Sequence, residues 1–147
     1  MALLNIDDIN VGDEYTEEIE FDEEQFASFI SITRDTAGIH TNRDFSREKR
    51  FDDLVVHGFL LSVHFSRILG MELPGENTVI GTIDLKFHEP VYLGDVVRYR
   101  ATVQRIIQPL GSVMLGLEIR KSSGSICVEG KTMCVFKDHN KGKTDRG

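Results

Sequence analysis

Residues 57–70 read HGFLLSVHFSRILG, and this run constrains how the rest of the chain is arranged. It starts beside Gly58, continues for about three helical turns, and reaches Gly70, a residue type that commonly ends helices. Apolar side chains fall on nearly every face of the segment. A helix of that kind is normally enclosed by the rest of its domain. The sequence therefore predicts a buried central helix over residues 58–69.

The residues that follow change from helical to alternating periodicity. Over residues 83–88, Ile, Leu and Phe alternate with Asp, Lys and His, which is typical of a half-buried strand. Further strands are indicated by three later runs, separated by short turns that contain glycine. These runs span residues 97–103, 113–119 and 126–135.

The residues before the central helix predict one strand and one helix. The strand covers about residues 13–20, and Asp22 and Gln25 then show the spacing of a helix-capping box. The helix that follows should end near Arg34. Residues 35–56 have no regular period, so we expect an irregular segment there.

The order of these elements defines the fold class. The strands are joined by hairpins and not by helical crossovers. This order, together with the buried helix, favours an α+β fold over an α/β fold with parallel strands. We expect one domain over residues 1–137, with a curved antiparallel sheet wrapped around the central helix. Residues 138–147 are polar and non-periodic, so we expect a flexible C-terminal tail.

The composition of the chain indicates which partners and which cell compartment to expect. The 147 residues carry a net charge of −7, which argues against nucleic acid as the main partner. No apolar run approaches the roughly 20 residues of a membrane helix. Cys127 and Cys134 have an odd separation in one predicted strand, which disfavours a disulfide, and no spaced Cys/His set suggests a metal site. We therefore expect a cytoplasmic protein without a bound metal.

Asp35 and His40 are the first candidates for catalysis. On a continuous helix, five residues turn through about 500°, so the two side chains would diverge by roughly 140°. They converge only if the backbone breaks between them, and Gly38 permits such a break. A carboxylate and an imidazole brought together can orient a water and remove its proton. From spacing alone, the commoner alternative is a helix-ending Asp35 and a surface His40.

Gly58 is the second candidate. Its N–H belongs to the donors that have no partner inside the predicted helix, and such a donor can hold a developing oxyanion. Glycine also lets a substrate approach the backbone closely. The alternative is that Gly58 only relieves crowding where the helix meets the sheet.

Several short motifs keep a common spacing from Asp35 to Asp95. Asp35, Ile39 and His40 fit a motif Asp-x-Asn-Pro-(Leu/Ile)-His, and a His-Gly pair at a helix start follows about seventeen residues later as His57-Gly58. The later matches are Ser66, Leu73-Pro74-Gly75, and Phe87, Pro90, Val91, Gly94 and Asp95. In this pattern the chain resembles the MaoC-like family of hot-dog proteins, in particular the (R)-specific enoyl-CoA hydratases. One departure is that Ala37-Gly38 replaces the Asn-Pro of the motif.

The resemblance implies a hydratase or dehydratase that acts on acyl thioesters. Asp35 and His40 would hold one water over C3 of a trans-2-enoyl thioester, and the Gly58 N–H would face the thioester carbonyl. Ser66 would form a hydrogen bond within the site and position the carboxylate, although a helix hydroxyl often bonds only to its own backbone. The substrate would be a thioester of CoA or of an acyl carrier protein, with no further cofactor. Hot-dog proteins of this type form homodimers with a continuous sheet.

Two groups of residues are candidates for substrate binding. Leu61, Phe65 and Ile68 lie at helical spacing and could line an acyl pocket, with plain core as their alternative role. A basic cluster follows His40. We expect it either to contact phosphate groups of the substrate or to be ordinary solvated surface. Its members are Arg43, Arg47, Lys49 and Arg50.

Two other functions stay open. An acyl-CoA thioesterase would place a carboxylate on the central helix, and residues 59–69 contain none. A non-catalytic acyl-CoA-binding protein is the other alternative, and the loss of Asn-Pro at residues 37–38 keeps it open.

Overall fold

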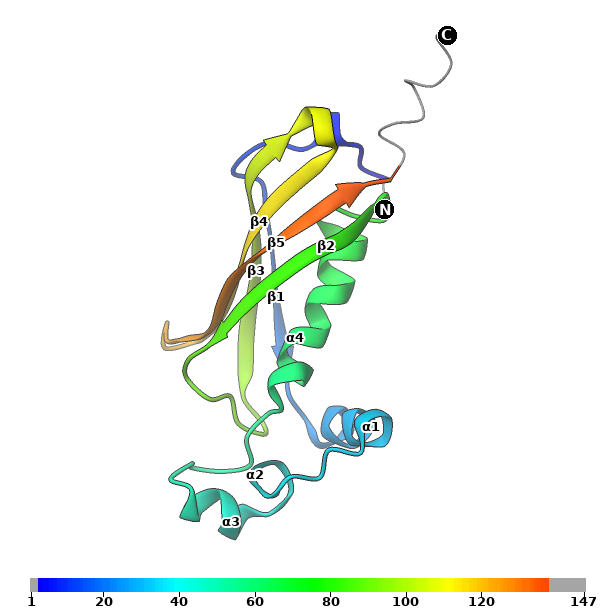
Figure 1. The fold of residues 1–147 in the computed structure, drawn as a ribbon. Helices are drawn as coiled ribbons and strands as arrows, with labels where there is room; N and C mark the ends of the chain where they lie inside the picture. Colours follow the sequence, from blue (N-terminus) through cyan, green and yellow to red (C-terminus); the bar gives the residue numbers. More distant parts are fainter. Residues whose placement is uncertain (1–2, 138–147) are drawn as a thin grey trace, which may run out of the picture.

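The computed structural model describes residues 3–137 of the chain. A five-stranded antiparallel sheet with the strand order β1-β3-β4-β5-β2 curves around α4, which covers one of its faces (Figure 1). The strands are β1 (Glu14–Glu20), β2 (Thr78–Phe87), β3 (Val96–Ile107), β4 (Ser112–Lys121) and β5 (Ile126–Phe136), and the helix α4 is Gly58–Arg67. The predicted α+β hot-dog arrangement is thereby confirmed. The predicted tail, residues 138–147, lies outside the described residues.

Shorter elements connect these parts. They are the 3₁₀ turns η1 (Ile6–Asp8) and η3 (Gln108–Leu110), the helices α1 (Glu23–Thr33), α2 (Gly38–Thr41) and α3 (Arg43–Glu48), and the π-helical turn η2 (Ile68–Glu72). The prediction for α1 is confirmed, because the Asp22 side chain accepts a hydrogen bond from the Gln25 N–H at 2.9 Å. The prediction of an irregular segment over 35–56 is wrong in part, because α2 and α3 form there. Helices of four and six residues are too short to show a helical period of apolar residues in the sequence.

The central helix differs from its prediction in two ways. It continues past Gly70, because η2 carries the chain on to Glu72. It is also open on one side: Phe59 is 83% exposed and Val63 49% exposed. The opposite face packs on the sheet and buries Leu60, Leu61 and Phe65. A ten-residue helix covered by a single curved sheet has only one face to bury.

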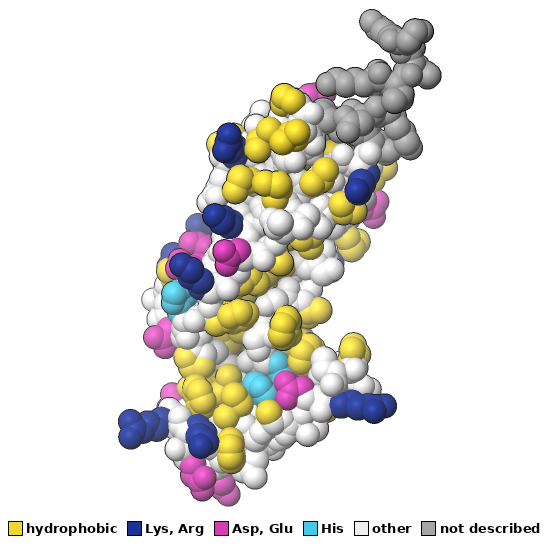
Figure 2. Space-filling model, viewed as in Figure 1, with side chains coloured by type: hydrophobic (Ala, Val, Ile, Leu, Met, Phe, Trp, Pro, Cys, Tyr) yellow, Lys and Arg dark blue, Asp and Glu magenta, His cyan; other side chains and the backbone are white. Residues whose placement is uncertain are grey.

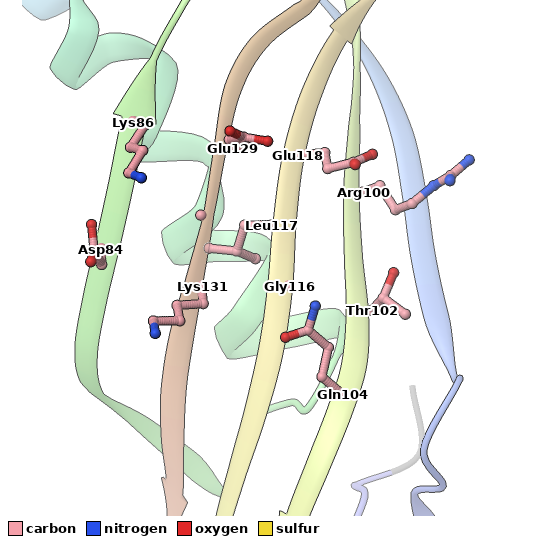
Figure 3. Close-up of a pocket in the computed structure, with 11 residues that line it drawn as sticks. Asp84, Lys86, Arg100, Thr102, Gln104, Gly116, Leu117, Glu118, Glu129 and Lys131 are labelled. Carbon is pink, nitrogen blue, oxygen red and sulfur yellow. The ribbon is translucent and has the colours of Figure 1, made fainter.

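The core lies between α4 and the inner face of the sheet. The alternating residues of β3 are all buried there, as the sequence predicts: Val97, Tyr99, Ala101 and Val103. The Tyr99 hydroxyl donates a hydrogen bond to the main-chain carbonyl of Leu61 at 2.7 Å, which ties the sheet to the helix. The outer face is polar and carries a hollow of about 550 Å³ above Gly116 and Gly130, with Asp84 and Lys86 at its rim (Figure 3).

The two edge strands of the sheet differ in character. The edge strand β1 carries four glutamates at positions 14, 17, 18 and 20. On β2 the residues Ile80, Ile83 and Phe87 are 42%, 44% and 53% exposed, so the predicted burial of this strand's apolar face does not occur within one chain. Within residues 3–137, the structure contains no helix with the length and hydropathy needed to span a bilayer.

Candidate active site

A cavity of about 780 Å³ lies between α4, β2 and the loop that follows α1. Most of its wall is apolar, and its titratable side chains Asp35, His40 and His57 lie together at one place in it. Figure 2 shows one face of the molecule, where histidine and acidic side chains lie side by side in the lower half and hydrophobic side chains border them. The lining residues are Phe29, Thr33, Asp35, His40, His57, Gly58, Phe59, Ser62, Val63, Phe65, Ser66, Ile80, Ile83, Leu85 and Phe87.

Asp35 is positioned by the end of α1. The helix stops at Arg34, whose φ of 60° is left-handed and turns the chain back. The Asp35 N–H then donates to Thr33 Oγ1 at 3.2 Å, and Asp35 Oδ1 accepts from the Ala37 N–H at 3.2 Å. These contacts hold one carboxylate oxygen, and within residues 3–137 the other oxygen of this cavity-lining side chain has no hydrogen-bond partner.

His40 is positioned by α2 and by the segment before α4. Its Nδ1 lies 2.7 Å from the Val55 main-chain oxygen. Because a carbonyl oxygen only accepts, Nδ1 carries the proton, and Nε2 of the neutral ring keeps its lone pair. Asp35 and His40 each present a side-chain atom within 4.8 Å of the other. The structure therefore brings together the two groups that the motif predicts.

Gly38 serves a different purpose from the one expected. The backbone breaks at residues 34–37, before Gly38, and Gly38 itself is the first residue of α2 with no positive φ. Its lack of a side chain matters because a Cβ there would lie 2.5 Å from Phe45 Cδ1. Packing, and not an unusual backbone angle, explains this glycine.

Gly58 begins α4 at the polar end of the cavity. Among residues 3–137, its N–H has no recorded hydrogen-bond partner and lies at the positive end of the helix. The ring of Phe87 lies beside it, 3.3 Å from where a Cβ would stand. Such a donor can stabilise negative charge on a carbonyl oxygen that enters the cavity.

His57 is a site residue that the sequence did not single out beyond its place before Gly58. It is 2% exposed, and its Nε2 lies 3.2 Å from the Asp35 main-chain oxygen. Its ring stacks on His40 with the centroids 3.8 Å apart and the planes inclined by 22°. Burial lowers the pKa of His57, so the ring is neutral near pH 7.

Two serines of α4 also line the cavity. Ser66, the predicted one, is exposed and lies two turns after Gly58. Ser62 lies between them and donates to the Gly58 main-chain oxygen at 2.9 Å. The spacing of four residues from 58 to 62 to 66 places all three on one helix face. This spacing could have identified Ser62 from the sequence.

The predicted acyl-pocket residues need a correction. Phe65 lines the cavity, but Leu61 and Ile68 do not; they are 4% and 0% exposed within the core. Leu61 lies on the face of α4 that packs on the sheet, and Ile68 is the first residue of η2, whereas Phe59 and Val63 line the cavity.

The basic cluster lies on α3 and just after it, outside the cavity lining. Arg43 forms an ion pair with Asp53 at 2.9 Å, and Lys49 lies 5.3 Å from the centre of the Phe45 ring. Arg47 and Arg50 are exposed. The structure does not bring these four residues to Asp35 and His40.

Asp35, His40 and His57 together could be suspected of binding a metal, because their ligand atoms lie within 4.8 Å of one another. Imidazole nitrogens bind a metal along lone pairs that lie in the ring plane. The planes of His40 and His57 are stacked and inclined by only 22°, so their lone pairs do not converge on one ion. The arrangement suits proton transfer better than metal binding.

The fold and this site define a hot-dog domain with a carboxylate and an imidazole at the end of an apolar cavity. A family model of the MaoC-like domain matches residues 9–114. The chain therefore belongs to the MaoC-like family.

Individual relatives agree with this assignment. The chain is similar to a mitochondrial 3-hydroxyacyl-[acyl-carrier-protein] dehydratase of Arabidopsis thaliana, with 30% identity over 90% of this chain and 70% of the relative. An (R)-specific enoyl-CoA hydratase of Rhodospirillum rubrum is 30% identical over 73% of this chain and 74% of its own length. The solved structure of an (R)-hydratase from Aeromonas caviae superposes with a TM-score of 0.82, at 26% identity, over 87% of this chain and 97% of that one.

Proposed function

We propose that this protein catalyses the (R)-specific hydration of trans-2-enoyl thioesters and the reverse dehydration of (R)-3-hydroxyacyl thioesters. The observation that carries the proposal is the meeting of Asp35 and His40 beside the unpaired Gly58 N–H, at the polar end of an apolar cavity. The relatives named as hydratases and dehydratases support the same reaction class.

The geometry supports a division of labour between the two side chains. A water held between the free Asp35 oxygen and His40 Nε2 loses a proton to Nε2 as its oxygen bonds to C3 of the substrate. The electron pair of the C2–C3 double bond moves onto C2 and the thioester oxygen. His40 then returns the proton to C2, so one water is added to one face of the double bond. Dehydration is the same path in reverse.

The Gly58 N–H acts on the charge that appears in the middle of this path. The thioester oxygen gains negative charge as the enolate forms, and a fixed donor at that point contributes on the order of 3 kcal/mol. General acid–base help from the side chains adds roughly 10²–10⁴ in rate. Ser66 lines the same cavity about two turns further along the helix, and a hydrogen bond from it to the substrate or the site stays a prediction.

The acyl chain occupies the apolar part of the cavity, against Phe59, Val63 and Ile83. A CoA or carrier-protein thioester supplies its own phosphopantetheine arm, and these proton transfers require no other cofactor. Contact between this arm and the basic residues of α3 stays a prediction.

We also infer that the protein forms a homodimer through β2. This strand lies at the edge of the sheet, and its apolar residues Ile80, Ile83 and Phe87 are exposed in a single chain. An exposed edge with free backbone groups and apolar side chains pairs readily with another strand. A second copy would cover this face and the open side of α4.

The cytoplasmic setting stays an inference as well. Cys127 and Cys134 are free thiols in the core. Burial raises the pKa of Cys134 to about 11, which keeps the thiol protonated and unreactive.

The decisive experiment follows the loss of enoyl absorbance with crotonyl-CoA, and in parallel the release of thiol from a saturated acyl-CoA. Asp35→Asn and His40→Ala should each lower kcat by at least about 10² while the protein stays folded. His88→Ala is a matched control, because the His88 side chain is exposed, does not line the cavity, and within residues 3–137 forms its hydrogen bond to Glu129 at 3.0 Å. Thiol release without hydration, or full hydration by either variant, would overturn the proposal.

A further inference from the structure

We infer that His57 is a positioning residue that holds the Asp35 loop and the His40 ring in their working geometry. The inference rests on the proposed function, since it assigns Asp35 and His40 to the reaction. It starts from two contacts of one buried side chain, a hydrogen bond to the Asp35 backbone and a stack on His40, and from the position of His57 immediately before Gly58.

The hydrogen bond fixes the tautomer of His57. The Asp35 main-chain oxygen can only accept a hydrogen bond, so His57 Nε2 carries the proton and donates the hydrogen bond, whose length is 3.2 Å. Nδ1 then has a lone pair, and it has no hydrogen-bond partner within the described residues although the atom is buried. A phenylalanine would fill this space among Phe26 and Phe29 without leaving a buried polar atom unpaired. The imidazole is therefore costly for packing alone and needs another reason.

The stack accounts for the orientation of His40. The one hydrogen bond recorded for the His40 ring within the described residues is the one from Nδ1 to Val55, and a single bond leaves the ring free to turn about it. The His57 ring lies flat against it at 3.8 Å and removes that freedom. Burial lowers the pKa of His57, and the charged or titratable groups that bear on it are Asp35 and His40. His57 therefore stays neutral and does not repel His40 when His40 carries a proton.

The hydrogen bond also explains how the loop works without the Asn-Pro of the family motif. Here Ala37-Gly38 supplies neither a bracing side chain nor a rigid ring. The loop at Asp35 is held from the side of α4 instead, through His57. One residue thus sets the relative positions of the carboxylate, the imidazole and, through the next peptide, the Gly58 N–H.

Three substitutions separate the hydrogen bond from the stack. In His57→Gln the amide nitrogen reaches the place of Nε2, and in His57→Asn it reaches only the place of Nδ1. His57→Phe keeps a stacked ring and loses the donor. We expect His57→Asn, which loses both the hydrogen bond and the stack, to lower kcat by more than about tenfold with KM unchanged. His57→Phe and His57→Gln each lose one of the two contacts, and each should lower kcat by less than His57→Asn does. Val103→Ala is the control for packing, because Val103 is buried on β3 and does not line the cavity, so it should lower the melting temperature and leave kcat unchanged.

Two structural measurements do not depend on turnover. Long-range ¹H–¹⁵N spectra at about pH 7 to 8 should show His57 as the neutral Nε2–H tautomer, because burial lowers its pKa. A crystal structure of His57→Phe should show the Asp35 backbone displaced relative to the wild type. Wild-type kcat in His57→Phe, equal losses in the Gln and Asn variants, or an Nδ1–H tautomer would each overturn the inference. A wild type that hydrates no enoyl thioester would instead refute the proposed function, and the displacement in the crystal would still decide the role of His57.

Discussion

Replacement of Gly38 by alanine tests the packing beneath the site. The new Cβ would stand 2.5 Å from Phe45 Cδ1 and 2.8 Å from Cγ, whereas carbon atoms normally approach to about 3.5–4.0 Å. The Phe45 ring must therefore retreat by about 1 Å. Rotation about its own axis cannot relieve the contact, because Cγ lies on that axis.

The magnitude follows from two opposing terms. Overpacking of this kind costs about 1–3 kcal/mol, and Phe45 is 40% exposed, so the lower half of that range applies. Alanine also gains about 0.4–1 kcal/mol by restricting the unfolded chain, because Gly38 has an ordinary backbone conformation. We expect Gly38→Ala to lower the free energy of unfolding by about 1 kcal/mol. In a Phe45→Ala background, Gly38→Ala should instead raise the free energy of unfolding by about 0.5 kcal/mol.

Urea unfolding of the two single variants, the double variant and the wild type gives the coupling energy directly. Gly70→Ala is the matched control, because nothing lies within 4 Å of its Cβ position and its φ is not positive. Crotonyl-CoA hydration by Gly38→Ala should fall as well, since α2 carries His40. Equal effects of Gly38→Ala with and without Phe45 would refute the packing explanation.

Two further predictions concern pH and assembly. Burial lowers the folded-state pKa of His57 and of His64. Below about pH 6.5 the unfolded chain therefore binds more protons than the folded chain does. The free energy of unfolding should therefore decrease between pH 6.5 and pH 5, by at most about 1.4 kcal/mol per pH unit for each histidine, and a flat profile in urea titrations would contradict this. Ile83→Lys places a charge on the exposed apolar face of β2 and should convert a dimer into a monomer in sedimentation velocity. An unchanged sedimentation coefficient would exclude β2 as the interface.

The regular elements could be predicted because their causes are local. Alternation along β3 follows from burial of one face, and the start of α1 follows from one side-chain cap at Asp22. Asp35 and His40 were found through a motif whose spacing the chain keeps. These features depend on residues close together in the sequence.

The remaining features depend on contacts that no local pattern records. The central helix is apolar all round, so its period could not show that Leu61 would face the sheet while Phe59 faced the cavity. The position of Gly38 depends on the Phe45 ring, which a separate short helix presents to it. The hydrogen bond and the ring stack of His57 join segments that lie far apart along the chain.

The unequal edges of the sheet limit how far association can proceed. If two copies pair β2 with β2 about a twofold axis, each outer border of the joined sheet is a β1 strand. That border carries the glutamates at positions 14, 17, 18 and 20, of which the first three pair with Arg100, Arg67 and Arg98, and a third chain would bring the same carboxylates against them. In such a dimer, growth by strand addition would stop at a closed pair, and the chain would avoid open-ended fibres without covering its second border.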